Sequence, residues 1–422
     1  MPTAVRRATG APEWEPPSGG LDTALVDQGP VEERMSRRTI ALALFGALAF
    51  VWASLAGLAG AVDPAVTQAA VDYLDTQQIS GTTPASGSGA WDSDPAFEFV
   101  TSEAVLAIAE GAQSGAAWST SDALAAVQST TNAQGTNPMP FLDLVAAGGL
   151  SPGKAAKLID LVAEPLGLDP TAFDPAGNGS PVNLVVAMGS GNPDGSFGPA
   201  NAFNQTLFAA LAHQLVNGSV PAQTVQYIRS KQKPSNGGWA FDADTGAVTD
   251  ADVDTTSLAI QALIAGGVVP SDPAVQGGLA FIASQQNADG SWSAFGNVSS
   301  ESTSRAILAI AAAGYDPNVS CWRDTVLPAS AGTPYGAPDN ALVGLQQADG
   351  SIVGPGSFSP AFSTAQAVQG LERTWLPVET APTQTCPAPG GEPAGTPAPA
   401  PAAPDGAVTP ATAIVATPNF TG

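Results

Sequence analysis

The chain has 422 residues, of which 44% are hydrophobic and only 6% are aromatic, so any core is built mainly from Ala, Val, Leu and Ile. The formal net charge is −24, from 37 acidic and 13 basic residues. A chain with this charge repels nucleic acid and anionic lipid, and no basic stripe reverses this locally. Nucleic-acid binding is therefore excluded, whereas divalent cations are tolerated.

The N-terminal part is typical of an export signal. Residues 1–34 are polar and are expected to be disordered, and both Met1 and Met35 remain possible start sites. A basic stretch then precedes the uncharged residues 39–61, which end in Ala-Gly-Ala. These are the three parts of a secretory signal. Because the apolar run exceeds the usual ~7–15 residues, an uncleaved membrane anchor is the alternative for residues 35–61. Either way, we expect an exported, extracellular or cell-surface protein.

Residues 62–378 contain an internal repeat. A Gly-rich loop recurs, as in "NPDGSFG", "SNGGWAFD" and "NADGSWSAFG", and each loop is followed by an apolar segment with helical i, i+3, i+4, i+7 spacing. A second helix is predicted before most loops, and Thr or Ser at the head of the apolar segment is expected to cap it. Six such helix pairs predict an all-α solenoid or closed ring. The apolar segments start at Thr101, Ala156, Thr206, Thr256, Thr303 and Thr364.

The repeat resembles that of terpene cyclases and protein prenyltransferases. In this family a helix ends in aromatic-x-x-x-x-Gln, and a loop with Gly-x-Trp or Asp-Gly-Ser-Trp leads to an Ala-rich helix. The clearest copies are "YIRSKQKPSNGGW" at 227–239 and "FIASQQNADGSW" at 281–292. The resemblance implies an α6/α6 toroid over residues 62–378. The superfamily also contains cobalamin carriers and bacterial surface proteins that are not enzymes, so the fold leaves the function open.

Aspartates crowd the segment before the fourth apolar helix, and three interpretations remain open. "DVDTT" at 252–256 resembles the D-x-D-D-T motif of squalene-hopene-type cyclases, which implies Asp254 as general acid supported by Asp252. Thr255 replaces the last acid of the motif, the chain has one helical domain instead of two, and the inner segments carry few aromatic faces for a carbocation. These departures weigh against a cyclase.

The second interpretation is calcium binding, and the third is helix capping. Asp242, Asp244 and Asp250 begin like a calcium loop, although the spacing departs from that of an EF-hand. Asp254 or Thr255 would also cap a helix in any protein. Zinc-dependent prenyl transfer is not expected, because His213 is the only histidine and neither cysteine falls on an inner segment.

The sequence therefore favours a ligand-binding or surface-interaction toroid over an enzyme. The ligand is a small molecule, with a corrinoid or an isoprenoid as candidate classes, or a component of the cell surface. The residues expected to contact it are Trp239, Phe241, Asp252, Asp254 and Thr255, although Trp239 is also explained by packing between repeats.

The C-terminal part has a different composition. Residues 379–422 are rich in Pro, Ala and Thr and are predicted to be a disordered spacer. Cys321 and Cys386 are the two cysteines, and in an exported chain they are expected to form a disulfide that links the folded domain to this tail. The alternative is two unpaired thiols.

Overall fold

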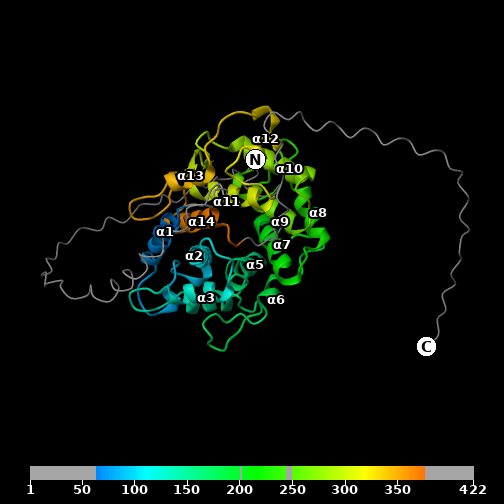
Figure 1. Cartoon of the computed structure of the whole chain (residues 1–422). Coiled ribbons are helices and arrows are strands. Elements are labelled where there is room, and N and C mark those ends of the chain that lie inside the picture. The colour runs from blue at the N-terminus through cyan, green and yellow to red at the C-terminus, as the bar shows by residue number, and fades with distance from the viewer. Residues whose placement is uncertain (1–62, 200–201, 244–249, 376–422) are drawn as a thin grey trace, which may run out of the picture. The chain divides into compact units, whose positions relative to one another are not determined.

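The computed structural model describes residues 63–375 except 200–201 and 244–249. The chain divides into Met1–Leu58 and Ala59–Gly422, and all described residues belong to the second unit (Figure 1). The predicted signal or anchor, the N-terminal preface and the predicted spacer lie outside the described residues. Within the described part, no helix has the length and hydropathy needed to cross a membrane.

Six helical segments form a closed inner ring, as the repeat predicted. They are α2 (Thr101–Gly111), α5 (Pro152–Leu158) with its π-helical continuation η3 (Ile159–Ala163), α7 (Phe203–Asn217), α9 (Val253–Ala265), α11 (Ser300–Ala312) and α14 (Pro360–Glu372). Each packs against the next, and α14 packs back against α2. Because this ring closes, the described unit is an all-α toroid, and the predicted fold class is confirmed.

The outer layer consists of shorter elements. Here α1 packs on α2 and α14, α3 on α2, α6 on α5, α8 on α7 and α9, α10 on α9, and α13 on α11 and α14. Their bounds are α1 Pro64–Thr76, α3 Thr120–Ser129, α4 Met139–Ala147, α6 Leu184–Met188, α8 Ala222–Ser230, α10 Pro273–Gln285, α12 Cys321–Val326 and α13 Pro338–Gly344, with 3-10 turns at Pro84–Ser86, Pro95–Phe97 and Pro328–Ser330. Strands β1 (Trp292–Ala294) and β2 (Asn297–Ser299) pair antiparallel, with Trp292 opposite Ser299.

The six inner helices run in the same direction. Near their N-termini, the amide of Gly153 on α5 donates to the side chain of Gln205 on α7 at 3.1 Å. At the same end, Glu301 on α11 accepts from the amide of Phe358, which precedes α14, at 2.6 Å. The ring therefore has one face formed by helix N-termini, which we call the mouth, and one formed by helix C-termini, which we call the base.

The recurring threonines hold the loops and do not cap the helices, which corrects the prediction. In five repeats the threonine Oγ1 accepts a hydrogen bond from a backbone amide of the preceding Gly-rich loop, at 2.9 to 3.2 Å. None of these threonines occupies the N-cap position. The pairs are Trp91 with Thr101, Phe197 with Thr206, Trp239 with Thr256, Trp292 with Thr303 and Ile352 with Thr364.

The loop tryptophans complete this connection. The indole N–H of Trp239 donates to the carbonyl of Ile228 on outer helix α8 at 2.7 Å, and that of Trp292 donates to Ile282 on α10 at 2.8 Å. Both rings are fully buried. Each loop is thus bonded to the outer helix before it and to the inner helix after it, which fixes the spacing between the two layers.

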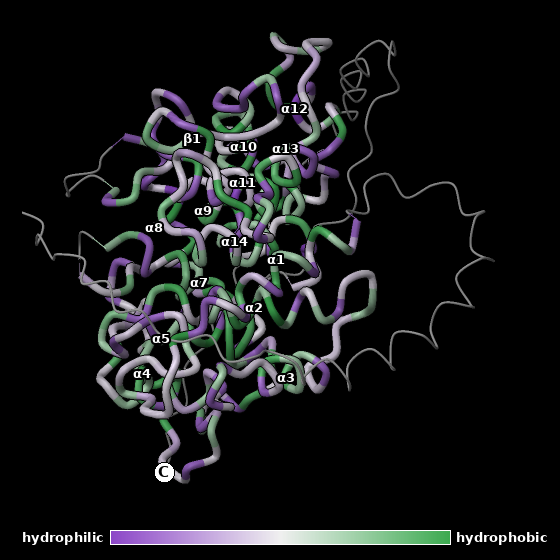
Figure 2. Tube along the Cα trace, turned by 90° about the vertical axis from the view of Figure 1, so that its left-hand side faces the viewer, coloured by the Kyte–Doolittle hydropathy of each residue, from purple (hydrophilic) through white to green (hydrophobic). Residues whose placement is uncertain are grey.

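The core follows from small side chains on the inner ring. On α9 every residue except Asp254 is buried. Alanines such as Ala259 and Ala262 are fully buried and allow neighbouring helices to approach closely. Hydropathy colouring shows the same pattern, with hydrophobic stretches concentrated on the labelled helices and hydrophilic residues on the surrounding loops (Figure 2).

Candidate functional site

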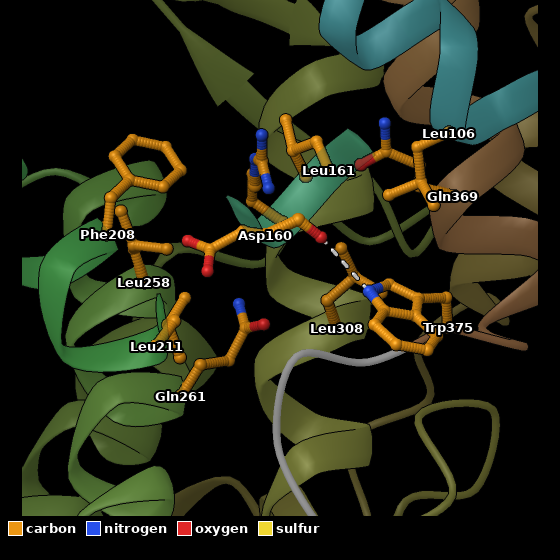
Figure 3. Close-up of a pocket in the computed structure, with 11 residues that line it drawn as sticks. Leu106, Asp160, Leu161, Phe208, Leu211, Leu258, Gln261, Leu308, Gln369 and Trp375 are labelled. Carbon is orange, nitrogen blue, oxygen red and sulfur yellow. Dashed lines mark hydrogen bonds between the residues drawn. The ribbon is translucent and has the colours of Figure 1, made fainter. Parts of the chain in front are cut away.

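The centre of the ring contains a narrow cavity to which all six inner helices contribute (Figure 3). The empty space between its walls is about 370 Å³ when the part open to solvent is included. The volume within which the centre of a water molecule fits is only about 20 Å³. A single water needs ~10–15 Å³ on this measure, so the cavity suits a ligand of a few atoms. Its wall consists of Leu106, Asp160, Leu161, Phe208, Leu211, Leu258, Gln261, Arg305, Leu308, Gln369 and Trp375.

Asp160 is the unusual residue of this wall. It lies in the π-helical turn η3, where the amide of Glu164 bonds the carbonyl of Ile159 at 3.1 Å. Asp160 is 1% exposed, and neither carboxyl oxygen has a hydrogen-bond partner among the described residues. Burial, and secondarily the charge of Glu164, raise the pKa of this carboxyl well above its usual range. Figure 3 shows the carboxyl directed toward Phe208 and Leu258. The cavity therefore contains an unpartnered carboxyl group, and burial favours its protonated form.

Sequence reasoning did not single out Asp160. The available signal was an acidic residue inside the apolar segment "AKLIDLVA". Acidic residues are rarely buried without a partner, so an acid in the middle of a predicted inner helix is a candidate functional residue. A π-helical turn at the same place supports Asp160 as a candidate functional residue, since such turns frequently occur at functional sites.

Trp375 closes the base of the cavity. The chain turns at Arg373, whose φ of 52° lies in the left-handed region and whose guanidinium bonds both carboxylate oxygens of Asp339 at 3.1 and 2.9 Å. The indole ring of Trp375 then lies 5.1 Å from that of Trp118, and its backbone amide donates to Glu110 at 3.1 Å. Burial raises the pKa of Glu110 well above its usual range, and its second oxygen has no partner in the described part of the chain.

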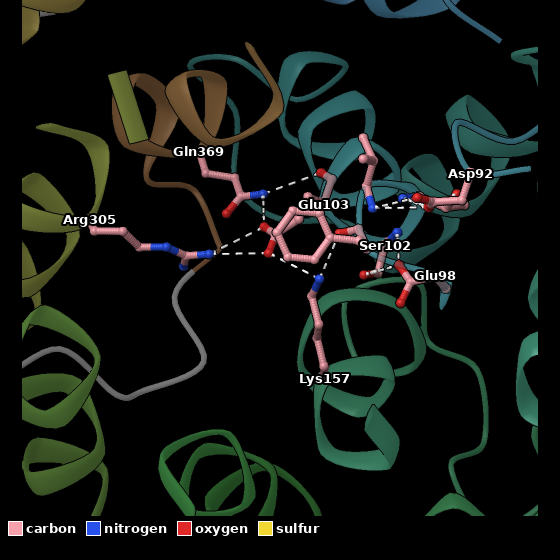
Figure 4. Close-up of polar contacts among 10 residues, drawn as sticks. Asp92, Glu98, Ser102, Glu103, Lys157, Arg305 and Gln369 are labelled. Carbon is pink, nitrogen blue, oxygen red and sulfur yellow. Dashed lines mark hydrogen bonds and ion pairs between the residues drawn. The ribbon is translucent and has the colours of Figure 1, made fainter. Parts of the chain in front are cut away.

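Glu103 is the centre of a buried ion network that includes Arg305 and Gln369 of the cavity wall (Figure 4). The carboxylate of Glu103 on α2 pairs with Arg305 on α11 at 3.2 Å and with Lys157 on α5 at 3.4 Å, and it accepts from the amide of Gln369 on α14 at 2.9 Å. Burial alone would raise the pKa of Glu103, but Lys157 and Arg305 outweigh it and lower the pKa. The charges of Lys157 and Arg305 are therefore neutralised in part by Glu103.

Asp252, and not Asp254, caps α9. The Oδ1 of Asp252 accepts the amide of Thr255 at 2.7 Å, while its Oδ2 has no partner among the described residues. Burial raises the pKa of Asp252. The prediction that Asp254 or Thr255 serves as the cap is wrong, because helix α9 begins at Val253 and only Asp252 occupies the N-cap position.

Asp254 faces the mouth of the ring. It is the exposed residue of α9, and it forms a hydrogen bond with Ser302 and lies near Arg305 and Glu301 on α11. Protein atoms surround it on most sides although its side chain reaches solvent, and this burial, together with the charge of Asp252, raises its pKa to about 6. The structure thus brings Asp252 and Asp254 together near the carboxylate of Glu301.

The remaining residues predicted to contact a ligand lie elsewhere. Trp239 is fully buried between repeats and does not line the cavity, which corrects its assignment to a ligand surface. Thr255 is also buried, with its amide used by the cap. Phe241 is 46% exposed in the loop before α9.

Phe241 belongs to a set of exposed phenylalanines around the mouth. Phe97, Phe241, Phe295 and Phe358 lie in the loops that precede α2, α9, α11 and α14, and Phe295 is 95% exposed. The ring centroids of Phe99 and Phe358 are 5.3 Å apart, so two of these loops meet. We call this set the aromatic rim.

The predicted calcium loop and disulfide are only partly described. Asp242 and Asp250 are described, whereas Asp244 lies outside the described residues. Within the described part of the chain, no three His, Cys, Asp or Glu side chains are grouped to hold a metal ion. Cys321 is disulfide-bonded, while its expected partner Cys386 lies outside the described residues. Calcium binding and the Cys321–Cys386 pair therefore stay predictions.

Comparison with known proteins identifies no close relative. No protein-family model matches the sequence, and no curated protein matches it. Among solved structures, the type II terpene cyclase MstE from Scytonema is 15% identical, with 73% of this chain and 96% of that chain covered and a TM-score of 0.45. A protein from Actinoplanes is 17% identical, with 74% and 99% covered and a TM-score of 0.43. Similarity at this level carries no information on activity.

Proposed function

We propose that the protein is an exported binding module that holds a small ligand in the central cavity of its toroid. The observation that carries this proposal is the carboxyl of Asp160, which is buried and unpartnered in a largely leucine-lined wall. Leaving a buried polar group unsatisfied costs about 1–3 kcal/mol. A ligand with hydrogen-bonding groups offsets this cost, which explains why the wall contains an acid without a protein partner.

The size of the cavity limits the ligand class. The room for water-sized molecules is about 20 Å³, whereas pockets for drug-sized ligands span roughly 300–1,000 Å³. A corrinoid or an isoprenoid is too large for this space, so a ligand of either class would bind at the mouth. The aromatic rim offers apolar surface there and supports a role in surface interaction.

The binding proposal is tested by native mass spectrometry of the full chain after exposure to cell and growth-medium extract. We expect a retained small mass in the unsubstituted protein and its loss in Asp160→Leu, which replaces the acid by the residue type of the surrounding wall. Asp122→Asn, at an exposed acid on outer helix α3, serves as the control and keeps the mass. A clean apo mass for the unsubstituted protein contradicts the proposal.

A second candidate is class II cyclase chemistry at the mouth, with Asp254 as general acid. The observation in its favour is the raised pKa of Asp254, to about 6, beside Asp252 and Glu301. At neutral pH most of this carboxyl is nevertheless ionised, which is unfavourable for protonating an alkene. Asp254→Asn is expected to abolish turnover of an isoprenoid at an unchanged melting temperature. Absence of turnover in the unsubstituted protein rejects this candidate.

A further inference from the structure

We infer that the ligand of the central cavity is an ammonium ion, either unsubstituted or with one short alkyl group, and that the carboxylate of Asp160 is its counter-ion. This inference rests on the proposed binding function and specifies its ligand class. The ligand is ammonium itself or a short alkylammonium ion, because the room in the cavity is about 20 Å³.

The first argument is the hydrogen-bonding capacity of Asp160. Both of its oxygens lack a partner among the described residues, and its carboxyl lines the cavity. An ionised carboxylate is an acceptor only, with room for several donors on its two oxygens. An alkylammonium group has three N–H donors and no acceptor. It can therefore donate hydrogen bonds to the carboxylate oxygens and brings no acceptor that would need a donor from the wall. A neutral ligand with one hydroxyl satisfies only part of it.

The second argument is the charge around Asp160. Of the charged groups on the described helices around the cavity, Arg305 and Lys157 are paired with Glu103. The one charge that shifts the pKa of Asp160 is Glu164, which is also acidic. No cation of the described helices is therefore paired with Asp160, so a bound cation would be its counter-ion. The titratable and charged groups of the inner helices around the cavity are Glu103 and Glu110 on α2, Lys154 and Lys157 on α5, His213 on α7, Asp254 on α9, Glu301 and Arg305 on α11, and Glu372 on α14.

The third argument is the rest of the wall. Trp375 and Phe208 line the cavity, and aromatic faces attract cations. The leucines Leu106, Leu211 and Leu258 surround the space beside them and suit a short alkyl chain. Arg305 is the cation of this wall, and its Nη2 pairs with Glu103 at 3.2 Å.

Binding of the cation displaces a proton. The protonated carboxyl of Asp160 releases H⁺ to solvent, and the resulting carboxylate accepts hydrogen bonds from R–NH₃⁺. No covalent bond other than O–H breaks, and the net charge of the cavity stays constant. Because proton and cation compete for the same carboxylate, the apparent affinity rises about tenfold per pH unit below the pKa of Asp160.

The experiment is isothermal titration calorimetry of the full chain with ammonium, methylammonium and ethylammonium chlorides. Ethanol, acetamide and sodium acetate serve as neutral and anionic probes of similar size. Paired buffers with different ionisation enthalpies count the protons released. We expect binding of the ammonium ions, release of one proton per ion, and an affinity that increases with pH.

Variants separate the site from general charge effects. Asp160→Asn is expected to weaken ammonium binding by at least about thirtyfold, since it removes a buried counter-ion. Asp160→Leu gives the same loss and is used in case the asparagine variant folds poorly, with circular dichroism to check the fold. Asp122→Asn makes the same replacement at an exposed acid on outer helix α3, outside the cavity, and leaves binding within about twofold.

The outcomes distinguish the two proposals. If ethanol or acetamide binds through Asp160 and the ammonium ions do not, the small-ligand site stands and the ammonium inference is overturned. Ammonium binding without proton release overturns the exchange at Asp160. If no probe binds and the extract experiment also gives a clean apo mass, both proposals fail.

Discussion

The indole N–H of Trp375 donates to the backbone carbonyl of Asp160 at 3.1 Å. This bond connects the residue that follows the last inner helix to the π-helical turn of the second inner helix, 215 positions earlier in the chain. It closes the base of the cavity and holds the turn that carries the unpartnered carboxyl. The stability of the ring and the geometry of the candidate site therefore depend on the same contact.

Trp375→Ala is expected to destabilise the protein by roughly 2–4 kcal/mol, below the ~3–5 kcal/mol of a fully buried Trp because Trp375 is only half-buried. Trp375→Phe keeps the ring against Trp118 and loses the hydrogen bond, so it is expected to cost about 1 kcal/mol from that bond plus the lost contacts of the smaller ring. Urea unfolding measures both values. Equal midpoints for the alanine variant and the unsubstituted protein contradict the role of Trp375 in closing the ring.

The pH dependence of stability provides a test of Asp160. The pKa of its carboxyl is raised in the folded state, so its contribution to stability is fully present below the unfolded value of ~3.9 and is lost as the pH rises through the folded pKa. Asp160→Asn removes this titration. We therefore expect the free energy of unfolding of the variant to fall less steeply above about pH 4.

Denaturant unfolding from about pH 4 to pH 9 gives the two curves. Asp122→Asn is the control and is expected to follow the unsubstituted protein. Parallel curves for Asp160→Asn and the unsubstituted protein show that Asp160 ionises normally in the folded state and contradict its burial as a neutral acid.

Thr256→Val tests the connection between loop and inner helix. The valine keeps the shape of Thr256 and removes the oxygen that accepts the amide of Trp239 at 2.9 Å, which leaves a buried N–H unpaired. The expected loss is about 1–3 kcal/mol in the free energy of unfolding. Thr256→Ser retains the acceptor and is expected to lose less. If valine and serine cost the same, the hydrogen bond is not what stabilises the repeat.

Asp252 and Asp254, at the start of α9, are distinguished by capping. Asp252→Ala removes the side chain that accepts the amide of Thr255 and is expected to cost about 0.5–2 kcal/mol. Asp254→Ala leaves the cap intact and is expected to cost much less. Thermal unfolding of the two variants under identical conditions compares them, and a larger loss for Asp254 reverses the assignment of the cap.

Calcium binding at Asp242, Asp244 and Asp250 predicts a melting temperature that rises with added calcium and falls with a chelator. Asp250→Asn is expected to reduce that shift by removing one carboxylate ligand. Magnesium at the same ionic strength is the control for general screening of the acidic chain. An unchanged melting temperature in the chelator removes the calcium hypothesis.

The sequence by itself determined the repeat and the six inner helices, because helical periodicity and Gly-rich loops are local properties of the chain. The toroidal class was implied by the resemblance of the repeat to that of terpene cyclases and protein prenyltransferases. It also located Asp252 and Asp254 at the start of α9. It could not assign the cap, since Asp252 and Asp254 are two positions apart and only the first turn of the backbone distinguishes them. Nor could it separate Trp239, which packs between layers, from a residue in contact with a ligand.

Only the tertiary structure decided which polar residues meet at the centre of the ring. Glu103 and Arg305 are 202 positions apart, and Trp375 reaches Asp160 because the last repeat closes onto the first. The direction in which a helical residue points is set by the neighbours on both sides of its helix, and those neighbours come from distant repeats. The charge state of Asp160 follows from the same closure, because burial by helices far apart in sequence is what raises its pKa.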